Sequence, residues 1–188
     1  TAKRALTSFP GVPGRMEVVQ EKPFRAVIDY AHTPDSLKAV YRTLTSKSRG
    51  KKLICVLGSA GGGRDTWKRP EFGRIASTYC RAIILTSEDP YDEPSEAIIE
   101  EIAAGCGGGK GWRCRVEKIA ERREAIVLAV GLAKPGDTIV VTGKGSERWM
   151  HLARGRKVPW SEREALEEAL RARIPTGRRG IIDDRSKQ

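Results

Sequence analysis

The sequence has few of the residues that build metal sites and disulfide frameworks. It contains two histidines and four cysteines among 188 residues. The cysteines are Cys55, Cys80, Cys106 and Cys114, and no two of them have the spacing of metal ligands. We therefore expect reduced, mostly buried cysteines in a cytoplasmic protein, with no metal ion bound by this chain.

Long apolar runs are also missing. The longest, 125–133, lies between Glu124 and Lys134 and is far shorter than the roughly 20 residues of a membrane-spanning helix. Segment 1–10 lacks the apolar core of a signal peptide. The sequence thus predicts neither membrane insertion nor secretion. Because residue 1 is not methionine, we expect the chain to be part of a longer protein.

The charge balance is strongly basic, with a formal net charge of +11. Such a charge is common in nucleic-acid-binding proteins, so a basic nucleic-acid-binding module is one alternative function. However, the basic residues are dispersed, no nucleic-acid motif is present, and segment 171–188 holds a good share of the excess positive charge. We favour a protein that binds no nucleic acid and has a basic, disordered tail at 173–188.

Apolar runs alternate with amphipathic segments along the chain. A buried strand is predicted at 24–31, and further strands are predicted at 53–57, 82–86, 113–116 and 138–142. Helices are predicted to begin at Thr33, Arg69, Ser95, Ile119 and Ser161. This alternation predicts an α/β fold with a Rossmann-like, mostly parallel, doubly wound sheet of about six strands flanked by helices.

Four polar segments follow or adjoin predicted strands. They are 29–34 (DYAHTP), 58–65 (GSAGGGRD), 88–91 (EDPY) and 143–147 (GKGSE). Open α/β sheets bind ligands where loops leave the carboxyl ends of strands, so we expect a site at this edge. The glycines allow backbone N–H groups to approach an anion, and Arg64 suits a carboxylate or phosphate.

Taken singly, these residues also have structural explanations. The glycine segment can be a flexible loop, and Asp29 can cap a helix start. His32 can be a satisfied, partly buried imidazole, and an isolated lysine such as Lys144 is usually exposed. Three carboxylates are either solvated loop charges or an acidic pocket for an amine: Glu88, Asp89 and Glu147.

In their order, the segments resemble the C-terminal domain of the Mur ligases, in particular the UDP-N-acetylmuramoyl-tripeptide synthetase type. The motifs are GVPGRME at 11–17, DYAHTPD at 29–35, GGGRD at 61–65, KRP at 68–70, EDP at 88–90 and GKGSE at 143–147. The resemblance covers about residues 9–171. It implies an inter-domain linker or hinge at 1–14 and an amino-acid-binding domain at 15–172.

The resemblance implies an ATP-dependent ligase of bacterial peptidoglycan biosynthesis. In that family ATP phosphorylates the D-Glu carboxylate of UDP-MurNAc-L-Ala-D-Glu, and the amine of a free amino acid attacks the acyl phosphate, with Mg²⁺ assisting. A central domain holds most of the ATP and Mg²⁺, and this sequence has no P-loop. We expect a chain that is inactive alone, acts with N-terminal and central domains in cis, and is monomeric.

Motif position also implies residue roles. The amino-acid substrate would contact Arg64, Glu88, Asp89, Tyr91, Gly143 and Glu147, with Arg64 on the α-carboxylate. The nucleotide side would contain Arg15, Asp29 and His32. No residue is assigned as general base.

Some positions depart from the family pattern. Tyr91 stands where diaminopimelate-adding members have an arginine for the distal carboxylate, and Asp89 stands in place of an asparagine. We therefore expect lysine or ornithine as substrate, although Arg81 or Arg148 is available to replace the missing charge. In two further departures, Ser146 stands where the family often has a histidine and Gly63 stands where it has an aspartate.

Two other Mur-like ligases, cyanophycin synthetase and folylpolyglutamate synthase, are alternatives on the same fold. The GRME and DYAHTPD motifs favour the muropeptide branch. A non-catalytic scaffold is a further alternative, although the presence of Arg64 and Glu147 weighs against it.

Overall fold

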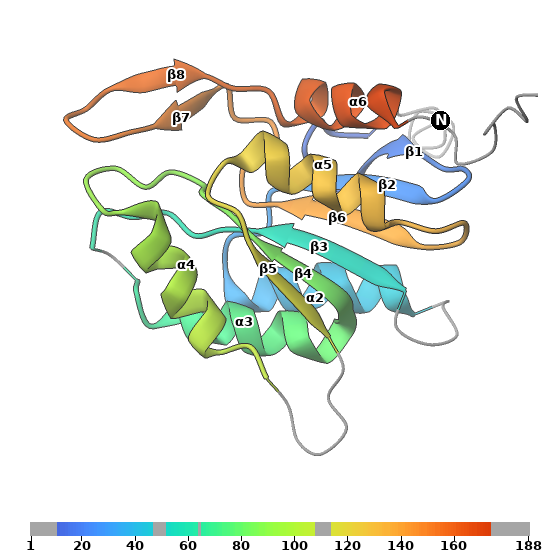
Figure 1. Cartoon of the computed structure of the whole chain (residues 1–188), viewed down its shortest axis with the longest axis horizontal. Helices are drawn as coiled ribbons and strands as arrows, with labels where there is room; N and C mark the ends of the chain where they lie inside the picture. Colours follow the sequence, from blue (N-terminus) through green and yellow to red (C-terminus); the bar gives the residue numbers. More distant parts are fainter. Residues whose placement is uncertain (1–10, 47–51, 64, 108–113, 174–188) are drawn as a thin grey trace, which may run out of the picture.

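The computed structural model describes residues 11–46, 52–63, 65–107 and 114–173. They form a six-stranded sheet, a separate two-stranded hairpin and surrounding helices (Figure 1). The strands are β1 (Glu17–Gln20), β2 (Arg25–Asp29), β3 (Leu53–Leu57), β4 (Cys80–Leu85), β5 (Arg115–Lys118), β6 (Thr138–Thr142), β7 (Trp149–His151) and β8 (Lys157–Pro159). The helices are α2 (Pro34–Thr45), α3 (Lys68–Tyr79), α4 (Ser95–Ala104), α5 (Arg122–Leu132) and α6 (Glu162–Ala172).

The sheet has the order β1-β2-β6-β3-β4-β5. β1 runs antiparallel to β2, and the other neighbours are parallel. The chain passes from β2 through α2 to β3, moves outward to β4 and β5, and returns through α5 to insert β6 between β2 and β3. This reversal of direction is the place where doubly wound sheets bind ligands. The predicted fold class is confirmed.

Alternate residues of the central strands face opposite helical layers. On β3, Ile54 and Val56 pack in a cluster with α5 and α6. Leu53, Cys55 and Leu57 pack in a second cluster with α2, α3 and α4. Because helices cover both faces of the sheet (Figure 1), every position of the strand is apolar. For this reason the sequence shows these strands as continuous apolar runs.

The predicted elements lie close to the observed ones. Thr33 caps α2 and Pro34 occupies its first turn, as predicted. Ser161 caps α6 by accepting a hydrogen bond from the N–H of Glu164 at 3.2 Å. The strand predicted from residue 113 begins at Arg115, and residue 113 itself lies outside the described ranges. β1 and the β7–β8 hairpin were not predicted, because they are short and mostly half-buried or exposed.

The cysteines lie within the fold. Cys55 and Cys80 are buried and Cys106 and Cys114 are half-buried, in agreement with the predicted burial. In the described part of the chain, no helix has the length and apolar character needed to cross a membrane.

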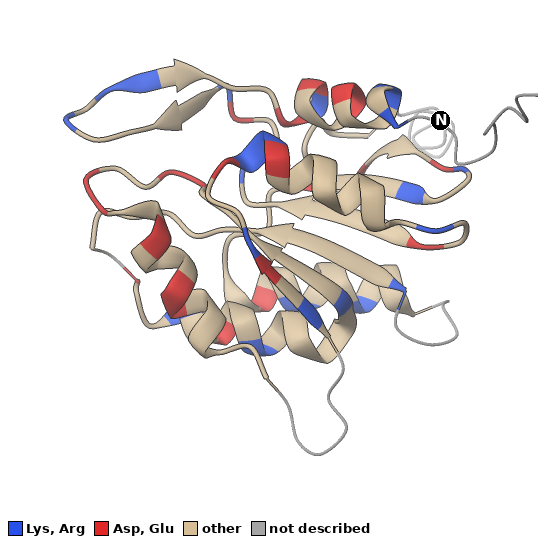
Figure 2. Cartoon of the chain, in the orientation of Figure 1, with Lys and Arg blue, Asp and Glu red and all other residues tan. Residues whose placement is uncertain are grey.

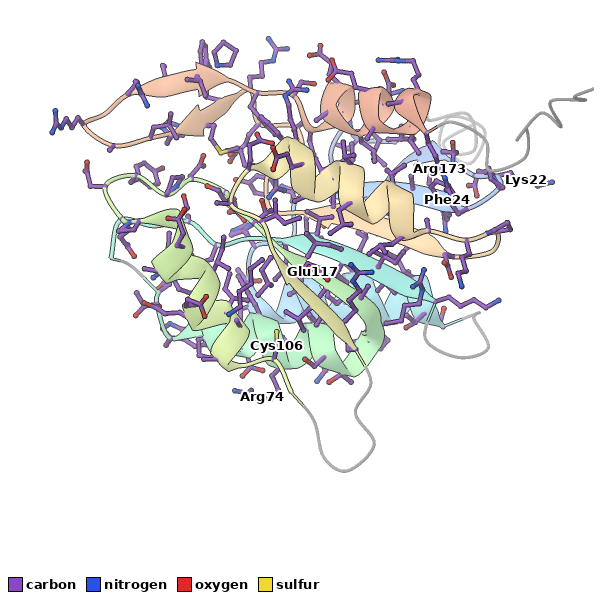
Figure 3. All side chains as sticks on the ribbon, in the orientation of Figure 1. Lys22, Phe24, Arg74, Cys106, Glu117 and Arg173 are labelled. Carbon is purple, nitrogen blue, oxygen red and sulfur yellow. The ribbon has the colours of Figure 1, made fainter. Side chains whose placement is uncertain are left out.

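Arg173 closes the described chain after α6. Its guanidinium donates to the carbonyl of Ala133 at 2.6 Å and lies 4.6 Å from the centre of the Phe24 ring (Figure 3). The end of α6 is therefore held against the sheet. Residues 174–188 of the predicted tail lie outside the described residues.

Candidate functional site

Loops from β3 and β4 pack closely at the carboxyl edge of the sheet. The N–H of Gly61 donates to the carbonyl of Asp89 at 2.7 Å. A Cβ atom on Gly61 would lie 2.1 Å from the Pro90 carbonyl oxygen, and one on Gly58 would lie 2.6 Å from that of Thr86. These glycines are needed for close backbone approach. The glycine segment is therefore packed against the β4 loop up to Gly61 and is not simply a flexible loop.

Arg64, the predicted carboxylate clamp, lies outside the described residues. The loop before it is held by Glu93, which accepts a hydrogen bond from the N–H of Gly63 at 2.5 Å. Glu93 also pairs with buried Arg69 at 2.9 Å. Hydrogen bonds from Arg69 and from Gly63 lower the pKa of Glu93.

Lys144 lies at the centre of the site. Its side chain is completely buried, and its ammonium lies 2.8 Å from each Asp89 oxygen and 2.6 Å from Glu147 Oε2. The interpretation of Lys144 as an exposed surface lysine is wrong, because the loop after β6 turns it inward onto two carboxylates. A buried ammonium is tolerated when it is paired in this way.

The two carboxylates have further partners from distant segments. Glu147 accepts a hydrogen bond from the Tyr30 hydroxyl at 2.6 Å, and Asp89 accepts one from the backbone N–H of His151 at 2.8 Å. Partial burial opposes ionisation of Glu147, but the hydrogen bonds from Lys144 and Tyr30 prevail and lower its pKa. The bond to Glu147, followed by burial, raises the pKa of Tyr30 to about 12. The network therefore holds the carboxyl groups of Asp89 and Glu147 in fixed positions.

Glu88 lies beside this network but differs from it. It is 7% exposed and accepts no hydrogen bond from any described residue. A Cβ atom on Gly143 would lie 2.1 Å from Glu88 Oε2, so the carboxyl group packs directly against that glycine. Burial raises the pKa of Glu88 to about 7, although the positive charges of Arg122 and Lys144 oppose the shift.

The predicted nucleotide-side residues lie near the carboxyl end of β2. Asp29 accepts two backbone hydrogen bonds at 2.7 and 2.8 Å, one of them from Met16. Asp29 thus clamps the segment before β1 and does not cap α2, which Thr33 caps. Arg15 is exposed, with its guanidinium 4.3 Å from the centre of the Tyr30 ring. His32 is exposed rather than partly buried, with Nδ1 3.0 Å from the Tyr30 carbonyl oxygen.

Tyr91 connects the β4 loop to the β7–β8 hairpin. Its backbone has φ of +50°, its ring stacks on His151 with centroids 5.3 Å apart, and it is 39% exposed. Arg81 does not replace the arginine missing at this position. It lies at the start of β4, at the other end of the strand, and binds Asp137 at 2.5 Å. Arg148 is exposed next to Glu147.

A buried ion pair beneath the site was missed in the sequence. Arg122 on α5 donates to Glu162 on α6 at 3.1 and 2.5 Å. It also donates to the carbonyls of Ser87 and Thr142, which follow β4 and end β6. No local signal reveals the pair, because its members are 40 residues apart. Tyr30 and His151 were missed for the same reason.

A groove of about 780 Å³ adjoins the site. It shares Gly145, Ser146 and Glu147 with the loop after β6, and its far side includes Trp149 and Trp160. The Lys144 network therefore borders an open surface, on which a ligand or another domain can approach.

Comparisons with known proteins identify the family of the chain. The family described as "Mur ligase, glutamate ligase domain" matches residues 14–145. A 2,6-diaminopimelate-adding UDP-N-acetylmuramoyl-L-alanyl-D-glutamate ligase of Aquifex aeolicus is 45% identical over 89% of this chain and 33% of its own length. A solved structure of a ligase with the same name is 34% identical, with a TM-score of 0.75, over 87% of this chain and 32% of that one.

The folylpolyglutamate synthase alternative is more distant. The Mycobacterium tuberculosis enzyme is 23% identical with a TM-score of 0.52, over 71% of this chain and 30% of that one. This likeness shows the fold alone. The chain spans about a third of the length of the relatives it matches. It belongs to the Mur ligase family, as a glutamate ligase domain.

Proposed function

We propose that the chain is the amino-acid-binding domain of an ATP-dependent ligase that adds a diamino acid to UDP-MurNAc-L-Ala-D-Glu. The observation that carries the proposal is the Lys144 network. It fixes Asp89 and Glu147 at the carboxyl edge of the sheet, beside the glycine segment that leads to Arg64. The Aquifex aeolicus relative is named for the addition of 2,6-diaminopimelate to the same type of acceptor.

The substrate contacts follow from this arrangement. Arg64 would bind the α-carboxylate, and an ammonium group would lie among the acidic and glycine residues of the edge. These are Glu88, Asp89, Gly143 and Glu147, with Tyr91 at the hairpin side. On the nucleotide side, Arg15 and His32 are exposed for contact, whereas Asp29 would act by positioning the segment that carries Arg15.

Phosphoryl transfer would belong to another domain. The sequence has no P-loop, and within the described ranges no three His, Cys, Asp or Glu side chains are grouped to hold a metal. The described residues therefore do not fit an Mg²⁺ site. ATP and Mg²⁺ would be bound mainly by a central domain in cis, in a cytoplasmic enzyme whose N-terminal and central domains complete the site when they close on this one.

The surroundings favour a cationic side chain on the incoming amino acid. Acidic residues follow the loop between β4 and α4 and continue along α4 (Figure 2). Tyr91 offers no positive charge for a distal carboxylate, and Arg81 is engaged elsewhere. We propose lysine or ornithine over diaminopimelate.

The test is ligation by the full-length enzyme. Phosphate release is followed with ATP, Mg²⁺, UDP-MurNAc-L-Ala-D-Glu and lysine, ornithine or diaminopimelate. Turnover that is lost in Arg64→Ala and kept in Arg74→Ala, an exposed arginine of α3, would support the ligase. Faster turnover with diaminopimelate would reject the proposed preference for lysine or ornithine, but it would leave the ligase function standing. No turnover with any of the three would reject the ligase.

A further inference from the structure

The proposed ligation needs a proton acceptor. An amino acid in neutral water carries an ammonium group, which has no lone pair, so one proton must leave before the nitrogen attacks the acyl phosphate. None of the roles assigned above supplies this group.

Most carboxylates of the site are already engaged. The oxygens of Asp29 accept two backbone N–H groups. Those of Asp89 accept Lys144 and a backbone N–H. Those of Glu147 accept Lys144 and a tyrosine hydroxyl. Of the described acids that are buried at this edge, Glu88 is the one whose oxygens accept no hydrogen bond from the described residues.

The position of Glu88 is fixed by close packing. Its Cβ would lie 3.0 Å from a Cβ added at Gly58, and its Oε2 would lie 2.1 Å from one added at Gly143. The carboxyl group is thus wedged between the ends of β3 and β6, at the carboxyl edge of the sheet. Two glycines give it room that any side chain would remove.

Four charged groups act electrostatically on the Glu88 carboxyl group. They are Arg122 from α5, Lys144 from the loop after β6, Lys68 from α3 and Asp89 from its own loop. Burial outweighs the three cations and raises the pKa of Glu88 to about 7. A general base works best with a pKa near the working pH, so Glu88 can accept a proton at neutral pH and release it again.

We propose that Glu88 is the general base of the ligation, which removes a proton from the incoming ammonium group; this inference rests on the proposed function. Glu88 takes one proton, and the freed nitrogen lone pair forms the C–N bond at the acyl carbon. The C–O bond to phosphate breaks and its electron pair leaves with phosphate. The second nitrogen proton goes to that phosphate, and Glu88 returns its proton to water.

The test compares two nucleophiles on the full-length enzyme. Hydroxylamine is uncharged near neutral pH and attacks acyl phosphates without a base, so its hydroxamate reports acyl-phosphate formation alone. In Glu88→Gln we expect kcat for the amino acid to fall by about 10²-fold or more, with hydroxamate formation at the wild-type rate. Glu124→Gln, the same change at an exposed position of α5, should leave both rates unchanged.

The pH profile gives a second readout. Wild-type kcat should rise with pH through a midpoint near 7. Glu88→Asp should keep this rise of kcat with pH, although at a lower rate. In Glu88→Gln the rise should be absent. A Glu88→Gln enzyme with a raised KM but normal kcat, or one that loses ligation and hydroxamate formation equally, would overturn the proposal. A wild-type enzyme that forms no hydroxamate would instead reject the ligase function itself.

Discussion

Two buried ionic groups lie at the same edge of the sheet and are built in opposite ways. Arg122 donates two hydrogen bonds to Glu162 and one each to two backbone carbonyls. Glu88, which is similarly buried, accepts none from the described residues. The first arrangement compensates for burial and joins α5, α6 and two strand ends into a scaffold. In the second arrangement no hydrogen bond offsets the free-energy cost of burying the Glu88 carboxylate, and such destabilising residues are often retained for function.

The largest effect should come from breaking the compensated pair. Glu162→Ala leaves the buried Arg122 guanidinium without its carboxylate, and we expect a loss of about 3–5 kcal/mol in the free energy of unfolding. Urea denaturation of the chain would measure it. Glu168→Ala, on the same helix, removes only the exposed partner of Arg123 and should cost about 1 kcal/mol or less. Equal losses in the two variants would contradict the scaffold role of Arg122.

Removing the uncompensated charge should have the opposite sign. The folded-state pKa of Glu88 is raised from 4.5 to about 7, so the unfolded chain releases this proton first and stability falls as pH rises between these values. Glu88→Gln removes the charge, and at pH 8 it should stabilise the chain by on the order of 3 kcal/mol. Near pH 4 the gain should disappear. Denaturation at both pH values checks this, and a variant that is less stable than wild type at pH 8 would refute it.

The same contrast explains what the sequence could predict. The strand at 53–57 is apolar at every position because it is buried on both faces, so burial and sequence pattern coincide. Thr33 and Ser161 act within one helical turn, and their roles are visible in local spacing. Features that depend on nearby residues, or on a continuous apolar run, were therefore predicted correctly.

The site residues depend on distant partners. Lys144 looks like a surface lysine until the fold brings Asp89 against it. The pairing of Tyr30 with Glu147 joins residues 117 positions apart. The β7–β8 hairpin has no apolar run, because its strands are short and mostly exposed and Met150 is the one residue of these strands buried in the core. Motif resemblance indicated where we propose that the substrate binds, but not which acids of that edge are engaged.

A smaller effect tests the space that Glu88 occupies. Gly143 has φ of +107°, and a Cβ atom there would overlap the Glu88 carboxyl group. We expect Gly143→Ala to lose about 1–3 kcal/mol of stability from backbone strain, with displacement of Glu88. Gly131→Ala is the control, because a Cβ atom at this helical position meets nothing within 4 Å and should stabilise by about 0.5–1 kcal/mol. Thermal or urea unfolding of both variants distinguishes strain at the site from a general effect of added methyl groups.

The smallest effect concerns the hydrogen bond between Tyr30 and Glu147 in the Lys144 network. Tyr30→Phe removes the hydroxyl that donates to Glu147, and we expect a loss of about 0.5–1.5 kcal/mol. Glu147 has a lowered pKa, so its stabilisation is present above its ordinary value of 4.5 and is lost as pH falls through the folded-state value. The difference between wild type and Tyr30→Phe should therefore shrink in acid. Tyr79→Phe removes a hydroxyl for which the described residues provide no hydrogen-bond partner and should change little at any pH. A Tyr30→Phe difference that persists unchanged at low pH would mean that the hydroxyl acts through packing, because protonated Glu147 no longer offers it a charged acceptor.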